Sequence, residues 1–339
     1  MSLMKSSFPL TVYRAESSTL ASITSDRIRQ FAFRSIDSLP DEKGYGFVNA
    51  DDMFDLDWHT SEKGHYMTFG FRVDVRKIPS IILKKHLNEM LKEERERLAA
   101  QGRKFISKDR KSELRELCKS RLLAKMEPRP SMSGVAIDMT TGLVYVASTS
   151  KPVFELFEQY FKTAFGGELE RLYPAAVVPS GSDHPLEDFM RELYTESMML
   201  SLNGKDYHIA EQGKATLSGT DGPSVSVTDA PDSARAGLES GLLFKSLKLR
   251  ISTMPEDELV SVFTLNSDFT FSGLKPPRMR KEKDADPDAD FLFKISFIEE
   301  TVNVFISSSF FFWRRSSFPV LYSPPAVPAL TPQRSWCKA

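Results

Sequence analysis

Residues 134–166 read GVAIDMTTGLVYVASTSKPVFELFEQYFKTAFG, and this stretch decides the class of the fold. Its first half holds two runs of β-branched and apolar residues around the sequence TTG (140–142), a pattern typical of two antiparallel strands joined by a tight turn. In its second half a helix is expected to begin at Pro152 and to end at Gly166, because proline suits the first turn of a helix and glycine follows its end. The expected inward face of this helix consists of Val153, Phe154, Phe157, Phe161 and Phe165.

Strands and helices follow no regular alternation in the rest of the chain. Residues 10–15 (LTVYRA) read as a strand, and residues 67–75 alternate apolar and polar side chains, which predicts a strand with one buried face. Three β-rich runs between 244 and 274 look like an antiparallel meander, and apolar residues from Phe291 to Phe305 recur at helical spacing. Residues 203–236, rich in Gly, Ser, Asp and Thr, are expected to form loops. The sequence therefore predicts an α+β fold.

Positive charge is concentrated between Lys84 and Lys125, which hold 14 Lys and Arg against 7 Asp and Glu, although the whole chain has a formal net charge of −1. Apolar residues recur there at helical spacing on both sides of Gly102, with Ser80 and Ser107 as candidate N-caps. The segment therefore predicts a hairpin of two charged amphipathic helices. Its expected apolar stripes are Leu83, Leu87, Met90, Leu91 and Leu98 in the first helix and Leu114, Leu117, Cys118 and Leu122 in the second.

Most cations of this hairpin gather on one side of each helix, apart from most of the glutamates, when residues are spaced at about 100°. A positive ridge of this kind fits the phosphates of a nucleic acid without any contact to the bases. By pattern alone, a solvated helix surface with Glu–Lys pairs is the more common explanation. The candidate phosphate contacts are Lys84, Lys92, Arg95, Arg103, Lys104, Lys108, Lys111, Arg115 and Lys119.

Motifs for nucleotide or cofactor chemistry are absent from the sequence, which holds neither a P-loop nor a strand-linked GxGxxG. One acidic cluster leaves a metal-dependent nuclease open, because such enzymes hold paired cations between carboxylates. It consists of Asp51, Asp52, Asp55 and Asp57, with His59 close by. A solvated acidic loop is the simpler interpretation, so we expect no catalytic residue, no metal and no cofactor.

The two cysteines, Cys118 and Cys337, are too few for a disulfide framework or a zinc site, which favours a reducing cytoplasm. No signal peptide is expected, and the apolar stretch VNVFISSSFFFW is shorter than the about 20 residues that cross a bilayer. We therefore expect no membrane partner. Residues 307–339 have no hydrophobic period and many prolines, and are expected to form a disordered tail.

Taken in order, these segments resemble the recombination-associated RdgC family. The likeness is clearest in KIPSIILKKHLNEMLKEERERLAAQGRKFISKDRKSELRELCKSRLLAK (77–125) and in the stretch at 134–166 that follows it. FAFRSIDSLPDEKGYGFVNADD (31–52) and LVSVFTLNSDFTFSGLKPP (259–277) keep the family's order at either end. The resemblance covers about residues 8–306 and rests on the order and spacing of segments.

The resemblance implies an RdgC-like α+β fold with mixed antiparallel sheets, a long charged helical hairpin and a horseshoe-shaped monomer. The expected parts are an N-terminal α+β part at 1–79, the basic helical hairpin at 80–126, a C-terminal α+β part at 127–306 and the tail at 307–339. One dimer contact is expected at Met126–Met132.

The resemblance to this family implies a function as well. The chain is expected to be a non-enzymatic, sequence-independent double-stranded DNA-binding protein, a ring-shaped homodimer that encircles DNA and restrains RecA-type recombination. Its expected location is the cytoplasm, in association with the nucleoid. Two alternatives stay open, a metal-dependent DNA exonuclease that uses the cluster at Asp51–Asp57 and a scaffold whose charged hairpin pairs with an acidic partner.

Overall fold

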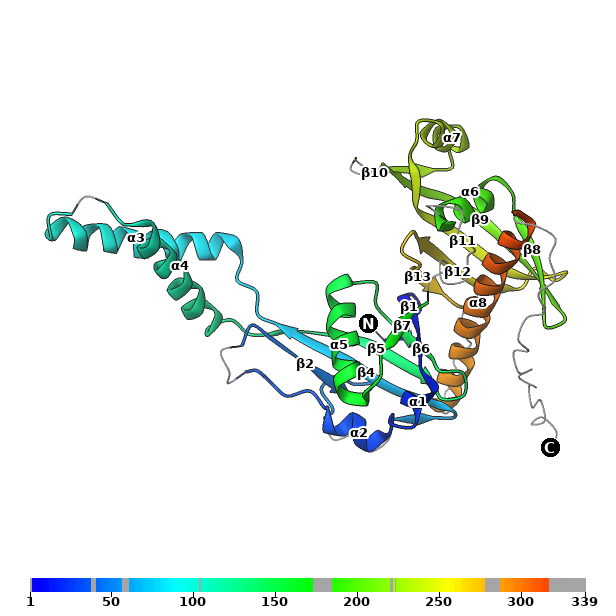
Figure 1. Cartoon of the computed structure of the whole chain (residues 1–339), viewed down its shortest axis with the longest axis horizontal. Coiled ribbons are helices and arrows are strands. Elements are labelled where there is room, and N and C mark those ends of the chain that lie inside the picture. Colours follow the sequence, from blue (N-terminus) through cyan, green and yellow to red (C-terminus); the bar gives the residue numbers. More distant parts are fainter. Residues whose placement is uncertain are drawn as a thin grey trace. The chain divides into compact units, whose positions relative to one another are not determined.

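The computed structural model describes residues 2–37, 41–56, 61–103, 105–172, 185–219, 222, 224–277 and 287–316 (Figure 1). Contacts between residues divide the chain into two compact units. Unit 1 comprises Met1–Lys5 and Val12–Glu170, and unit 2 comprises Ser6–Thr11 and Arg171–Ala339. The four parts expected from the sequence were divided where the residue pattern changes, whereas the two units are divided by contacts. The four-part division therefore stays a prediction.

An antiparallel sheet is the framework of unit 1. Its strand order is β2 (Lys43–Val48), β4 (Tyr66–Val75), β5 (Arg129–Asp138) and β6 (Leu143–Val146), followed by the end of β1 (Phe8–Ala15), and the short β3 (Glu62–Lys63) pairs with β4. The turn from β5 to β6 is the predicted one: Gly142 has a φ of 75° and donates its N–H to the Asp138 carbonyl. The strand pair expected from the opening stretch is therefore confirmed.

Helix α5 (Lys151–Phe165) supplies the largest side chains of the unit 1 core, as its periodic phenylalanines predict. The Phe157 ring lies 5.4 Å from that of Phe71 on β4, and the Phe165 ring stacks on Phe47 of β2 at 5.7 Å. Gly166 ends the helix in the left-handed region at φ 80°, a conformation that costs glycine little. The helix begins at Lys151, one residue before the expected Pro152.

Strand β4 differs from the prediction of a single buried face. Met67, Phe69 and Phe71 face the core, but Arg72 and Asp74 on the other side are buried too. The Arg72 guanidinium donates two hydrogen bonds of 2.7 Å to the Asp74 carboxylate, so both charges are compensated where water is excluded. The alternation of side chains thus assigned the residues to the two faces correctly, but it did not reveal that Arg72 and Asp74 on the second face are buried as well.

The described residues of unit 1 form four helices besides α5. The short α1 (Ser17–Leu20) and α2 (Ser25–Gln30) follow β1, and α3 (Ser80–Ala100) and α4 (Lys108–Leu123) lie between β4 and β5 in the chain. Thr24 and Ser107 cap α2 and α4, because each side-chain oxygen accepts the N–H three residues on. The expected cap at Ser80 is wrong: α3 already begins at Ser80, and Pro79 precedes it without a side-chain cap.

Unit 2 contains a second antiparallel arrangement of strands. Their order is β10 (Ser224–Thr228), β9 (Lys205–Ser218), β11 (Leu243–Met254), β12 (Leu259–Asn266) and β13 (Phe271–Lys275), followed by the start of β1, while β8 (Met198–Leu202) pairs with β9. The predicted meander between 244 and 274 is therefore confirmed as β11, β12 and β13. The short β7 (Leu169–Arg171) spans the boundary between the units.

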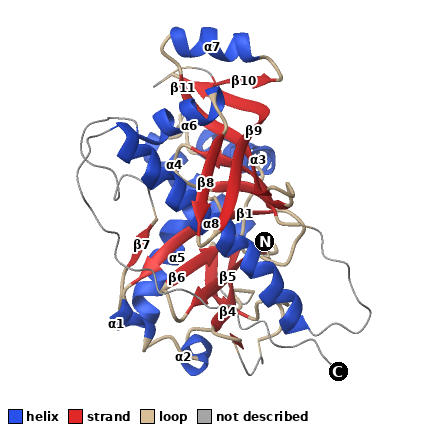
Figure 2. Ribbon diagram, turned by 90° about the vertical axis from the view of Figure 1, so that its right-hand side faces the viewer, coloured by secondary structure: helices blue, strands red, loops and turns tan. Residues whose placement is uncertain are grey.

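Helices α6 (Pro185–Thr195), α7 (Pro231–Glu239) and α8 (Pro287–Ser316) belong to unit 2, and α7 lies next to β9 and β10 (Figure 2). The helical spacing expected after Phe291 is confirmed by α8, which buries Phe291, Ile295, Ile298 and Val302. The described part of the chain contains no helix that is long and apolar enough to cross a membrane.

Two sequence expectations in unit 2 need correction. Residues 203–236 are not mainly loop, since they contain β9, β10 and part of α7. Helix α8 extends to Ser316 and thus includes residues 307–316 of the expected disordered tail, while 317–339 lie outside the described residues. In both places the polar or serine-rich composition concealed regular backbone structure.

Candidate nucleic-acid interface

Helices α3 and α4 pack against each other, and we call them the α3–α4 pair (Figure 1). The buried apolar side chains of the pair are Leu98 on α3 and Leu114, Cys118, Leu122 and Leu123 on α4. Leu117 was expected in the same stripe but is 43% exposed, because it lies one residue off the buried spacing of 114, 118 and 122. Packing of two amphipathic faces thus leaves the charged sides of both helices in solvent.

A buried carboxylate connects the two helices. Glu94 of α3 accepts a hydrogen bond of 2.9 Å from Nε of Arg110 on α4 and one of 2.7 Å from Nη2 of Arg97. The hydrogen bond from Arg110 is the largest influence on Glu94 and, with Arg97, holds the pKa of this carboxyl below its usual range. A signal for this role is present in the sequence, since Glu94 lies on the apolar stripe between Leu91 and Leu98, but the highly charged composition of the segment hid it.

Replacement of Glu94 by Gln is expected to destabilise the protein at pH 7 and to have less effect in acid. A carboxyl with a lowered folded-state pKa stabilises the fold above its unfolded pKa, near 4.5, and this contribution is lost as the pH falls through the folded pKa. Urea denaturation at pH 7 and at about pH 3.5 measures the difference in unfolding free energy. The exposed neighbour substitution Glu93→Gln serves as the control, and an equal Glu94→Gln effect at both pH values contradicts the assignment.

The candidate phosphate contacts lie on the α3–α4 pair and on the connection between its helices. Lys84, Lys92 and Arg95 on α3 share one helical side, and so do Lys108, Lys111 and Arg115 on α4, because separations of 3, 4, 7, 8 and 11 residues return to similar angles. These six residues and Arg103 are exposed, and none forms an ion pair with a carboxylate of the described chain. Lys104 lies outside the described residues.

Lys119 differs from the other candidates. Its ammonium group lies 2.6 Å from a carboxylate oxygen of Glu42, and the hydrogen bond with Glu42 raises the pKa of Lys119. Both side chains are partly exposed, so the pair is open to solvent and to salt. A phosphate contact at Lys119 requires its ammonium group to leave Glu42. The sequence around Lys119 does not reveal this ion pair, because Glu42 lies far away in the chain.

Three acidic side chains of the α3–α4 pair have partners other than the six cations. Glu89 lies 3.1 Å from the His86 ring, and Glu113 accepts a hydrogen bond of 2.8 Å from Arg110. Glu94 is buried in the contact between the helices. These three carboxylates are therefore hydrogen-bonded to groups other than the six cations.

The described carboxylates of the acidic cluster already have partners in the loop itself and in β3. Asp51 lies 2.8 Å from the Lys63 ammonium group, and Asp55 accepts a hydrogen bond of 2.7 Å from the Asn49 amide. Asp52 accepts the backbone N–H of Phe54. Asp57 and His59 lie outside the described residues, so the structure does not bring the whole predicted set together.

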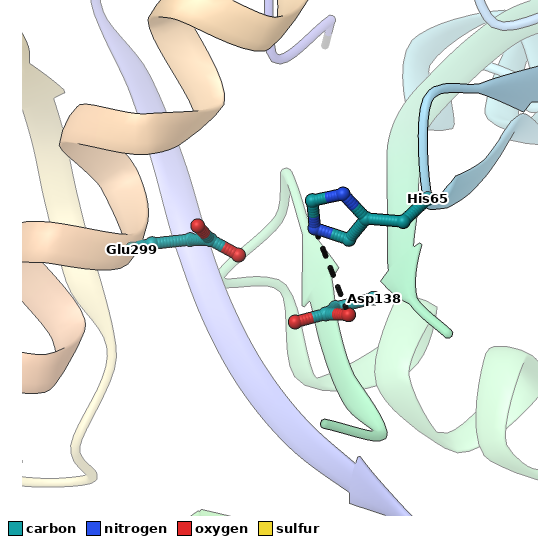
Figure 3. A group of neighbouring side chains, drawn as sticks. All are labelled: His65, Asp138 and Glu299. Carbon is teal, nitrogen blue, oxygen red and sulfur yellow. Dashed lines mark ion pairs between the residues drawn. The ribbon is translucent and has the colours of Figure 1, made fainter. Parts of the chain in front are cut away.

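A further pair of titratable side chains lies in unit 1. Nε2 of His65 is 3.9 Å from Oδ1 of Asp138 at the end of β5 (Figure 3). Asp138 is buried and accepts hydrogen bonds from the backbone N–H and the hydroxyl of both Thr140 and Thr141. Burial acts to raise the pKa of this carboxyl, but the threonine hydrogen bonds outweigh it and the pKa is lowered. These contacts explain Asp138 as the residue that holds the β5–β6 turn.

Antiparallel sheets, a phenylalanine-rich helix and a pair of helices with exposed cations define an α+β protein with a candidate polyanion-binding surface. A family model described as “Putative exonuclease, RdgC” matches residues 9–180, just over half of the 339 residues. The chain therefore belongs to the RdgC family, as its sequence resemblance predicted. Membership places it among recombination-associated, nucleic-acid-related proteins. No curated protein matches the chain.

Proposed function

We propose that this protein binds double-stranded DNA without sequence preference through the α3–α4 pair. The observation that carries the proposal is a set of exposed cations on these helices that form no ion pair with a carboxylate of the described residues, namely Lys84, Lys92, Arg95, Lys108, Lys111 and Arg115. Lysine and arginine side chains of this kind replace the counterions of DNA phosphates, and release of those counterions drives binding. Family membership supports the same proposal, because the matched residues 9–180 include both helices.

Binding through phosphates alone has a measurable signature. The logarithm of the association constant should fall linearly with the logarithm of the salt concentration, with a slope of about −0.9 for each phosphate neutralised. Fluorescence anisotropy with two duplexes of unrelated sequence measures this slope for the wild-type protein. We expect equal affinities for both sequences and a slope of several units. A protein that binds neither duplex at low salt contradicts the proposal and favours the scaffold with an acidic protein partner.

We further propose that two copies form a ring around the duplex and restrain RecA-type recombination, in association with the nucleoid. The proposal rests on family membership and on the gain from presenting the same cations twice to one duplex. Solution mass with and without duplex DNA tests it, with a dimer expected in both states. A monomer that stays a monomer on DNA contradicts the ring, and unimpaired RecA-driven strand exchange contradicts the restraint.

A role without catalysis is part of this proposal, and the exonuclease is its rival. Two described carboxylates of the acidic cluster already bind Lys63 and Asn49, which makes them poor ligands for paired cations. Incubation of linear duplex DNA with Mg²⁺ or Mn²⁺ should leave the DNA intact. Degradation that stops in the Asp52→Ala or Asp55→Ala variant favours the exonuclease instead.

A further inference from the structure

The connection between α3 and α4 presents an aromatic side chain to solvent. Phe105 is 87% exposed, the largest exposed fraction among the large apolar side chains that the structure describes. A single exposed apolar residue is ordinary on a protein surface. A functional role for Phe105 must therefore be argued from the residues near it and from the hydrogen bonds that hold the adjoining backbone.

The backbone on both sides of Phe105 is anchored. On the α3 side, the N–H groups of Gln101 and Arg103 both donate to the Leu98 carbonyl, and Gly102 adopts the positive φ typical of a helix end. On the α4 side, Ile106 is buried and the Ser107 hydroxyl caps the helix. The hydrogen bond between Glu94 and Arg110 fixes the two helices to each other next to the connection. Phe105 therefore lies between the hydrogen-bonded end of α3 and the capped start of α4, with its side chain exposed to solvent.

Positive charge surrounds this residue in the chain. Arg103 precedes it, and Lys108 and Lys111 follow it in the first turns of α4, all exposed and without a carboxylate partner in the described chain. Asp109 is the acidic residue of the first turn of α4. An aromatic ring next to several cations matches the chemistry of single-stranded DNA, whose backbone attracts the cations and whose unpaired bases offer flat faces for stacking.

We propose that Phe105 stacks on an unpaired base of DNA whose phosphates are held by Arg103, Lys108 and Lys111. The inference rests on the proposed DNA-binding function and assigns to Phe105 the contact with single strands and frayed duplex ends. Paired bases inside a duplex expose no face to such a ring, so the aromatic contact favours unpaired over paired DNA.

The test compares Phe105→Ala and Phe105→Leu with the wild type on two DNA probes. One probe is an oligothymidine with a single 2-aminopurine, and the other is a duplex closed by loops of a non-nucleosidic linker, without free ends or unpaired bases. We expect both variants to bind the single strand about tenfold more weakly than the wild type, because leucine keeps an apolar side chain but lacks a flat ring. Affinity for the closed duplex should change less than twofold. Quenching of 2-aminopurine fluorescence should occur with the wild type and be lost in both variants.

The outcomes separate this inference from the proposal beneath it. Wild-type protein that binds neither probe overturns both. Binding of both probes with equal affinity in all three proteins overturns the stacking contact alone. An affinity that is retained in Phe105→Leu but lost in Phe105→Ala also overturns stacking, since it indicates apolar burial such as contact with a second copy of the chain. Unchanged circular dichroism of both variants shows that their fold is intact.

Discussion

Reversal of two charges on α4, Lys111→Glu together with Arg115→Glu, is expected to lower the affinity for duplex DNA about a hundredfold at about 0.1 M salt. Each cation that contacts a phosphate contributes about 0.9 to the salt slope, which corresponds to nearly tenfold in affinity at that salt concentration. The new carboxylates add repulsion to this loss. Both side chains are exposed and have no ion-pair partner among the described residues, so the substitutions should leave the fold unchanged. Anisotropy titrations at several salt concentrations should show a slope reduced by about two.

The matched control reverses two exposed cations of unit 1 outside the α3–α4 pair, Arg14 and Lys151. The double variant Arg14→Glu with Lys151→Glu changes the net charge by the same amount, and it should keep most of the affinity and the original slope. An equal loss in both double variants indicates a response to net charge alone. An undiminished affinity in Lys111→Glu with Arg115→Glu removes α4 from the interface.

Replacement of Phe157 by Ala is expected to have the largest effect on stability. Its side chain is fully buried, and its ring lies 5.4 Å from Phe71, 5.9 Å from Phe161 and 6.4 Å from Tyr13. Removal of a buried phenylalanine leaves a cavity in addition to the lost burial, at a cost of about 4 kcal/mol. Urea denaturation followed by circular dichroism measures the loss, and the midpoint of thermal unfolding should fall by about 10 °C.

Phe105→Ala is the control for this stability prediction, because it removes the same side chain from an exposed position. Its unfolding free energy should equal that of the wild type within about 0.5 kcal/mol. Should Phe157→Ala be as stable as Phe105→Ala, the packing of α5 on the sheet of unit 1 is wrong.

The sequence predicted elements well where local signals are strong. The phenylalanines of α5 repeat at helical spacing over about three turns. Gly166 ends the helix in the left-handed region, which glycine adopts without strain. Ser107 caps α4, as predicted, because its hydroxyl reaches an N–H only three residues away. Signals of this kind need no knowledge of the rest of the chain.

Prediction failed where structure depends on distant residues. Strand β9 buries Tyr207, Ile209, Ala215 and Leu217, but Glu211 and Gly213 interrupt the apolar alternation between them, so the segment resembled a loop. Burial of Arg72 follows from its partner Asp74 and from the rings of Phe33 and Phe54 over its guanidinium. Alternation in β4 could not reveal those aromatic contacts from other segments.

The same limit applies to the candidate interface. Helical spacing sufficed to group the cations of α3 and α4 by side, and the structure finds seven of the nine exposed without a described carboxylate partner. The pairing of Lys119 with Glu42 joins segments far apart in sequence and could not be predicted. The role of Glu94 could have been inferred only from the rule that a buried charge on an apolar stripe is paired with an opposite charge, here that of Arg110.

Under the proposed binding of DNA, the length of α3 sets a scale for the stretch of duplex that one molecule would cover. A helix of 21 residues is about 31 Å long at a rise of 1.5 Å per residue. Laid along the axis of B-form DNA, it spans about nine base pairs, close to one helical repeat. Duplexes much shorter than this offer too few phosphates for the whole helix, so affinity should rise with oligonucleotide length up to about one repeat.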